Sequence, residues 1–336
     1  MSLAELTSRG EGGRVPPFFE KLRKKLHRLL IFGEGYANIN LPLIFPPFSD
    51  PRRITSEMPV SLEDRDLANQ HFDRGLSFDM RGKLPEAISE MEKAVSLDPE
   101  FAEAFNKLGD FLLKKGRLLN AIDMFKKSCE LKPEIENSHF DLGCSYAQAG
   151  RYSEALYELQ KALSINPKHY EIYGKIGFVF LKMAMYGEAT ENLKRALVKD
   201  PVDIMARFTL GQAYLKLDQK SDANQQFEKI IEHFSGLIER KDRFAEGHYF
   251  IGRSYFFMQK FDRAVEFLSK AIEYDTEAVD FHFSFGMSYS DADAFFALAE
   301  AQTSLGDKKA ARTNLEKALA QKPHDERFLA LQKQLY

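Results

Sequence analysis

The sequence predicts an all-α solenoid of stacked helix pairs, preceded by an N-terminal extension. Three observations predict this fold: five glycines recur every 34 residues, small residues follow them at fixed offsets, and a proline closes each of the first four units. One pair of short helices cannot bury its apolar face alone, so units that repeat in this way must stack on one another.

The periodic positions have a direct physical role. The glycines are Gly75, Gly109, Gly143, Gly177 and Gly211, and the first small residues are Ala87, Ala121, Ala155, Ala189 and Ala223. The second small residues are Ala94, Ser128, Ala162 and Ala196, and the prolines are Pro99, Pro133, Pro167 and Pro201. Small residues let two antiparallel helices approach closely, and proline ends the second helix. Gly116, Gly150 and Gly187 are expected in the turn inside a pair.

This pattern resembles the tetratricopeptide repeat family, which implies a right-handed solenoid of about seven helix-turn-helix repeats. The expected repeats are 68–101, 102–135, 136–169, 170–203, 204–237, 245–278 and 292–325, followed by a capping helix at 326–336. Insertions of 7 and 13 residues displace the sixth and seventh repeats. The expected domains are an N-terminal extension, 1–60, and the repeat array, 61–336.

One stripe on the first helix of each repeat is unexpectedly apolar. At about 100° per residue, positions 5, 9 and 12 share a face with positions 2 and 13, away from the stripe that packs within the repeat. We call this face the inner stripe. Its apolar members at positions 5, 9 and 12 are Phe72, Leu76, Leu113, Phe140, Cys144, Ala147, Phe178, Leu181, Phe208, Leu215, Tyr249, Phe256 and Phe296. The resemblance implies that the inner stripe lines a concave groove for a partner segment, although neighbouring first helices also bury part of it.

The residues expected to contact a partner are aromatic, with one arginine among them. They are Phe72, Phe140, Phe178, Phe208, Tyr249, Arg253, Phe256 and Phe257. Repeat six has the highest aromatic density, and rigid aromatic rings beside an arginine are typical of binding hot spots. The carboxylate-clamp form of the family is not expected, because no repeat combines Lys at position 5 with Asn at position 9.

The N-terminal extension contains two distinctive segments. A basic amphipathic helix is expected at 17–31, with Lys21, Arg23, Lys24, Lys25 and Arg28 opposite its apolar face. This helix either caps the first repeat or docks on an anionic membrane surface or a partner helix. The apolar, proline-rich strip at 38–51 is expected to be extended. It lies on the protein's own surface, occupies the groove in cis, or binds another protein.

The insertion at 278–293 alternates phenylalanines at Phe281, Phe283 and Phe285. Alternation is typical of a strand, yet no partner strand is apparent in the sequence. A helical extension, or a loop folded over the aromatic residues of repeat six, is therefore expected.

Composition excludes several classes of protein. The 47 Lys and Arg residues against 50 Asp and Glu give a net charge of -3, so nucleic acid is not an expected partner. The two cysteines, Cys129 and Cys144, exclude a disulfide scaffold and a thiolate-based zinc site. They fit a reducing compartment, so a cytoplasmic location is expected, with peripheral membrane attachment through 17–31 left open.

The sequence contains no motif for catalysis, cofactor binding or metal binding. His71, His139 and His248 all occupy position 4 of a repeat, where the family prefers a large packing residue. No enzyme activity, cofactor or metal is therefore expected, and an adaptor that binds protein is predicted. The alternatives are a peripheral membrane assembly factor and a regulatory subunit of an enzyme encoded elsewhere. The oligomeric state stays open.

Overall fold

The computed structural model of the protein describes residues 60–240, 244–274, 281–282 and 288–336. These residues belong to the second of two compact units, which spans Pro59–Tyr336. The basic helix expected at 17–31 and the strip at 38–51 lie outside the described residues.

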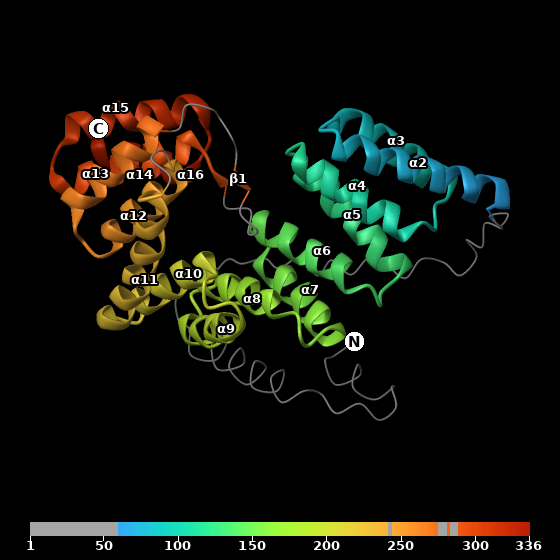
Figure 1. Ribbon diagram of the computed structural model, residues 1–336, viewed down its shortest axis with the longest axis horizontal. Helices are drawn as coiled ribbons and strands as arrows, with labels where there is room; N and C mark the ends of the chain where they lie inside the picture. Colours follow the sequence, from blue (N-terminus) through green and yellow to red (C-terminus); the bar gives the residue numbers. More distant parts are fainter. Residues whose placement is uncertain (1–59, 241–243, 275–280, 283–287) are drawn as a thin grey trace, which may run out of the picture. The chain divides into compact units, whose positions relative to one another are not determined.

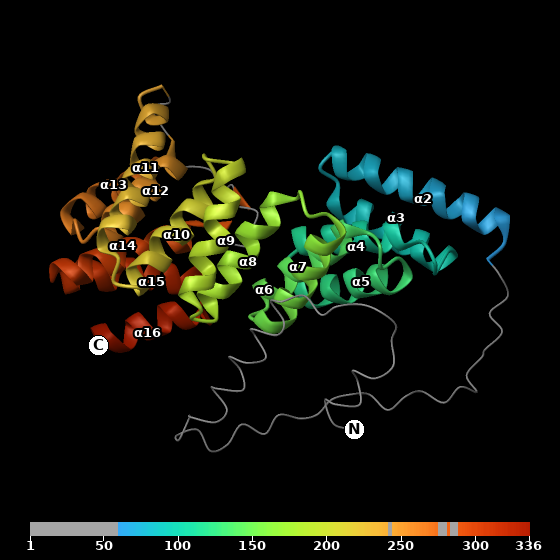
Figure 2. The same cartoon turned by 90° about the horizontal axis from the view of Figure 1, so that it is seen from below.

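The described part of the chain is a succession of helix pairs (Figure 1). The first helices are α2 (Leu62–Met80), α4 (Ala102–Lys114), α6 (Glu136–Gln148), α8 (Tyr170–Lys182), α10 (Ile204–Lys216), α12 (Ala245–Phe257) and α14 (Asp291–Leu305). The second helices are α3 (Leu84–Leu97), α5 (Leu118–Leu131), α7 (Tyr152–Ile165), α9 (Tyr186–Lys199), α11 (Lys220–Ile238), α13 (Phe261–Tyr274) and α15 (Lys308–Gln321). Each second helix packs on its own first helix and on the first helix of the next pair, so the pairs stack in chain order (Figure 2). The predicted all-α solenoid is confirmed.

The two helices of a pair approach most closely at the periodic glycines. A Cβ atom on Gly177 would lie 2.5 Å from Leu193 Cγ, and one on Gly109 would lie 2.6 Å from Phe125 Cε1. Both distances are far below van der Waals contact, so a larger residue would push the helices apart. The large side chain of the second helix lies directly over the glycine of the first.

The turn inside a pair places one residue in the left-handed region. Gly116 and Gly150 occupy it with φ of 76° and 75°, as expected. In the fourth pair the left-handed residue is Ala184, with φ of 57°, whereas Gly187 lies inside α9. The expectation that Gly187 forms this turn was therefore wrong. The end of α8 at Lys182 sets the position of the turn, and Ala184 adopts a conformation that costs a non-glycine residue about 1 kcal/mol.

The insertion before α14 contains a short strand pair. Strand β1 (Phe281–His282) pairs antiparallel with β2 (Ser288–Tyr289), and Phe281 lies opposite Tyr289. The expectation of a helical extension or a loop was wrong at these positions. The sequence showed no partner because each strand is only two residues long, too short to give a recognisable alternation.

The apolar core is continuous from α3 to α12 and then divides. One cluster of buried residues runs from Ala87 to Ile251. A second, small cluster joins Leu268 of α13 to Leu298 of α14. A third joins α14 and α15 to α16 (Glu326–Leu335), where Phe328 is fully buried. Helix α16 therefore covers the last pair.

Candidate partner-binding surface

A pocket of about 420 Å³ opens over three successive first helices. It is lined by Leu181 and Lys182 of α8, Tyr186 of α9, Gln212, Leu215 and Lys216 of α10, and Phe257 of α12. Apart from Tyr186, these residues occupy positions 9, 12 and 13 of their first helices in the predicted repeat frame. The pocket therefore lies on the inner stripe, where it offers room for a bulky side chain.

The pocket combines apolar walls with two lysines that have no ion-pair partner among the described residues. Lys182 and Lys216 lie in the last turns of α8 and α10, and both are exposed. The Lys182 ammonium group lies 5.3 Å from the centre of the Phe178 ring. Partial burial, and then the charge of Arg327, lower the pKa of Lys182. Because no ion pair to either lysine is present within the described residues, a partner's carboxylate would be favoured at the rim of the pocket.

The aromatic residues predicted in repeat six have partners inside the fold. Phe257 lines the pocket, and its ring stacks on that of Phe227 at 5.6 Å. Arg253 Nη1 donates to Glu300 Oε2 at 2.5 Å, and its guanidinium lies 5.2 Å from the Phe256 ring and 5.1 Å from the Phe257 ring. The Arg253 side chain is only 14% exposed. Within the fold, its main contact is the ion pair to α14.

The remaining predicted residues are buried or half-buried. Phe178 and Phe208 are 8% and 7% exposed, so both belong to the core. Phe72, Phe140 and Tyr249 are half-buried. In this region the inner stripe divides between core residues, Phe178 at position 9 and Phe208 at position 5, and pocket residues at positions 9, 12 and 13.

The basic residues predicted for membrane or partner contact lie outside the described residues. They are Lys21, Arg23, Lys24, Lys25 and Arg28. Within the described residues, no helix has the length and apolar character needed to cross a membrane.

Sequence reasoning missed the two pocket lysines. Lys114, Lys182 and Lys216 all stand at position 13, and the last two are 34 residues apart in successive repeats. This regular spacing was the available signal. It went unused because exposed lysines on a helix are usually solvated.

A half-buried carboxyl group, that of Asp141, lies beside the inner stripe in the third pair. Asn106 Nδ2 of α4 donates to Asp141 Oδ2 of α6 at 3.0 Å. Burial, and then the charge of Asp110, raise the pKa of Asp141 from 3.8 to about 7. At a pH between these two pKa values, Asp141 keeps its proton in the folded state and has lost it in the unfolded state.

We therefore expect stability to fall as the pH rises from about 4 to about 7, and the contribution of Asp141 to stay constant above that window. Asp141→Asn should be more stable than the wild type at pH 8, because the amide is neutral and its oxygen still accepts from Asn106. The slope of this contribution is at most about 1.4 kcal/mol per pH unit. Urea unfolding of both proteins across this range checks the prediction, and parallel pH profiles would contradict it.

The comparison with protein families agrees with the stacked helix pairs. A family model described as TPR repeat matches residues 75–116 and 143–183. Models described as tetratricopeptide repeat match 102–135, 205–236 and 249–326. The chain belongs to the tetratricopeptide repeat family. A comparison with curated proteins found no match to this tetratricopeptide repeat protein.

Solved structures share the fold of this tetratricopeptide repeat protein. A tetratricopeptide repeat protein from Parabacteroides merdae matches 80% of this chain and 99% of its own, with 16% identity and a TM-score of 0.63. A chain of the APC/C hetero-tetramer Cut9-Hcn1 matches over 83% of this chain and 50% of its own, with 19% identity and a TM-score of 0.55. At these identities the likeness concerns the fold.

Proposed function

We propose that this tetratricopeptide repeat protein is a non-catalytic adaptor that binds a partner protein in the pocket formed by α8, α10 and α12. The segment that it binds carries a bulky apolar side chain next to a carboxylate. The observation that supports this proposal is the pairing of apolar walls with two lysines, neither of them ion-paired within the described part of the chain, in one hollow of about 420 Å³.

The chemistry of the pocket favours such a segment. Leu181, Leu215 and Phe257 supply an apolar surface, and covering it with an apolar side chain lowers the free energy because water is displaced. Lys182 and Lys216 can each form a charge-assisted hydrogen bond with a carboxylate. Rigid helices present both features, so little conformational entropy is lost on binding.

Two other roles remain predictions. Attachment to a membrane through 17–31 depends on residues outside the described range. A role as regulatory subunit of a separate enzyme would use the same pocket for the enzyme's own segment.

A charge reversal tests the proposal. Short random peptides displayed on phage would be selected on the full-length protein, and the recovered peptides are expected to combine a large apolar residue with Asp, Glu or a free C-terminus. The double variant Lys182→Glu/Lys216→Glu should bind the selected peptides at least about 100-fold more weakly, since each charged hydrogen bond contributes roughly 1.5–3 kcal/mol.

A matched control is Lys229→Glu, an exposed lysine on α11 that does not line the pocket. It should bind as the wild type does. Equal binding by the double variant, or selected peptides without acidic and apolar residues, would overturn the proposal.

A further inference from the structure

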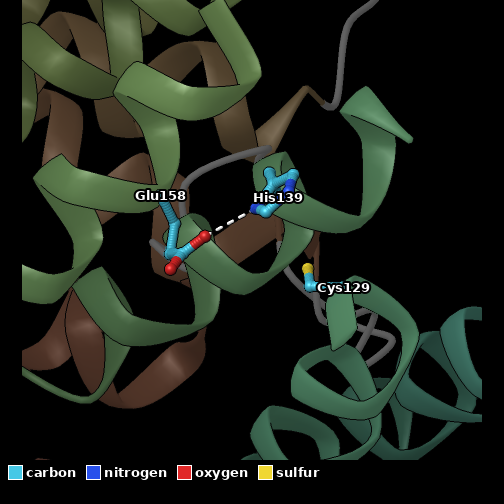
Figure 3. A group of neighbouring side chains, drawn as sticks. All are labelled: Cys129, His139 and Glu158. Atoms are coloured by element: carbon cyan, nitrogen blue, oxygen red, sulfur yellow. Dashed lines mark hydrogen bonds and ion pairs between the residues drawn. The ribbon is translucent and has the colours of Figure 1, made fainter. Parts of the chain in front are cut away.

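Three metal-ligating side chains from three helices lie together, away from the residues that line the pocket. Figure 3 shows Cys129 of α5, His139 of α6 and Glu158 of α7 beside one another, and their donor atoms all lie within 4.8 Å of each other. The side chains of His139 and Glu158 are 3% and 12% exposed. The histidine and the carboxylate are thus held inside the fold.

The hydrogen bonds of His139 prepare one ring nitrogen for a cation. Its Nε2 lies 3.0 Å from the Pro133 carbonyl oxygen, an acceptor, so Nε2 carries a proton. Its Nδ1 lies 2.6 Å from Glu158 Oε2, a hydrogen bond in which one proton is shared between the two atoms, and a metal ion could replace that proton. Histidine ligands of metals commonly donate their second ring N–H to a backbone carbonyl, which fixes the tautomer and the ring.

A second histidine–glutamate pair in the same protein serves as a comparison for the site at Cys129, His139 and Glu158. His71 Nδ1 and Glu90 Oε2 are 2.7 Å apart and 19 residues apart in sequence, the same separation as for His139 and Glu158. No cysteine joins that pair in the described residues. A histidine–glutamate pair alone is therefore a structural contact between two helices. At His139 and Glu158, Cys129 of the preceding pair supplies a third, soft ligand, which distinguishes this site.

We infer that Cys129, His139 and Glu158 form a binding site for a zinc ion. Sulfur, nitrogen and oxygen ligands suit Zn²⁺, and water can complete a tetrahedral set. Binding releases two protons, one from the Cys129 thiol and one from between His139 Nδ1 and Glu158 Oε2. The resulting thiolate and carboxylate balance the charge of Zn²⁺, so the buried site is neutral.

The neighbouring groups tolerate this arrangement. Lys161 Nζ lies 3.7 Å from Glu158 Oε1, so Oε2 remains the oxygen available to the metal. Tetrahedral bonds of about 2 Å place neighbouring ligand atoms about 3.3 Å apart, so Nδ1 and Oε2 separate by about 0.7 Å when the proton leaves. Two cysteines are too few for a zinc site built mainly from thiolates. The site inferred here needs only one thiolate, because a histidine and a glutamate supply the other protein ligands.

Cobalt provides a sensitive probe of the site. The full-length, metal-free protein is titrated with Co²⁺, which gives a thiolate-to-metal charge-transfer band in the near ultraviolet when cysteine is a ligand. One equivalent should produce this band in the wild type and in Cys144→Ser, and one equivalent of Zn²⁺ should remove it. Cys129→Ser should lose the band, and its zinc affinity in equilibrium dialysis should fall by more than about ten-fold.

Two further variants distinguish the loss of a zinc ligand from a general defect in folding. Glu158→Gln retains a hydrogen-bond acceptor for His139 but should weaken zinc binding, whereas His71→Gln should leave zinc binding unchanged. Zinc should also protect Cys129, but not Cys144, from alkylation in the wild type, as read by mass spectrometry. Absence of the cobalt band in the wild type, or an undiminished band in Cys129→Ser, would overturn the inference.

Discussion

Phe227→Ala is expected to destabilise the fold by about 3–5 kcal/mol. Phe227 of α11 is fully buried, and its ring packs against Phe208 at 5.8 Å and Phe257 at 5.6 Å. Truncation leaves a cavity between α10, α11 and α12, which rigid helices cannot close. Urea unfolding followed by circular dichroism measures the loss, with Tyr157→Ala as a control. Tyr157 is 55% exposed, so that change should cost less than about 1 kcal/mol.

A second substitution tests whether the cavity is the cause. A Cβ atom on Gly211 would lie 2.7 Å from the Phe227 ring, so Gly211→Ala alone should destabilise the protein. In the Phe227→Ala background the same methyl group enters the cavity and should restore part of the stability. Additive losses in the double variant would contradict this account of the packing.

Glu300→Ala is expected to cost about 3 kcal/mol, because it leaves the Arg253 guanidinium without its carboxylate inside the fold. This value is the lower end of the range for buried pairs, since the Glu300 side chain keeps 26% exposure. Chemical unfolding is the measurement. Glu266→Ala is the control, because Glu266 is 40% exposed and pairs with exposed Lys270 and Arg263, so its loss should cost less than about 1 kcal/mol.

The double variant Arg253→Leu/Glu300→Leu separates the ion pair from the packing around it. Replacing both charges with apolar side chains removes the unpaired cation, so this protein should recover much of the stability lost in Glu300→Ala. If Glu300→Ala and Glu266→Ala cost the same, the contact between α12 and α14 does not depend on this pair.

The sequence was sufficient to predict the helix pairs and the turns at Gly116 and Gly150, but not the turn in the fourth pair. The 34-residue spacing of glycines and alanines depends on close approach within a pair, a local constraint that each repeat satisfies in the same way. The turn at Ala184 could not be predicted, because alanine has no preference for the left-handed conformation that it adopts here. The strand pair of β1 and β2 escaped prediction for a different reason, since its two strands are only two residues long.

The inner stripe could be predicted, but its division into core and pocket could not. Helical periodicity places Phe208 and Leu215 on the same face, yet Phe208 is buried by rings from two neighbouring helices while Leu215 lines the pocket. The ion pair of Arg253 with Glu300 was also out of reach, because the partner lies 47 residues away across an insertion. Such contacts depend on which helices stack, which periodicity within one repeat does not encode.

The division of the apolar core after α12 affects how the molecule opens. Continuous burial from Ala87 to Ile251 couples the earlier pairs. Helix α14 divides its buried side chains between a cluster with α13 and a cluster with α15 and α16, whereas α15 and α16 contribute only to the latter. Helices whose apolar contacts are mostly their own can undergo sub-global unfolding while the rest stays native. The C-terminal end would then exchange its amide protons through excursions that leave the pocket assembled. Unfolding of this chain is therefore expected to be graded, with α15 and α16 opening before the helices that precede them.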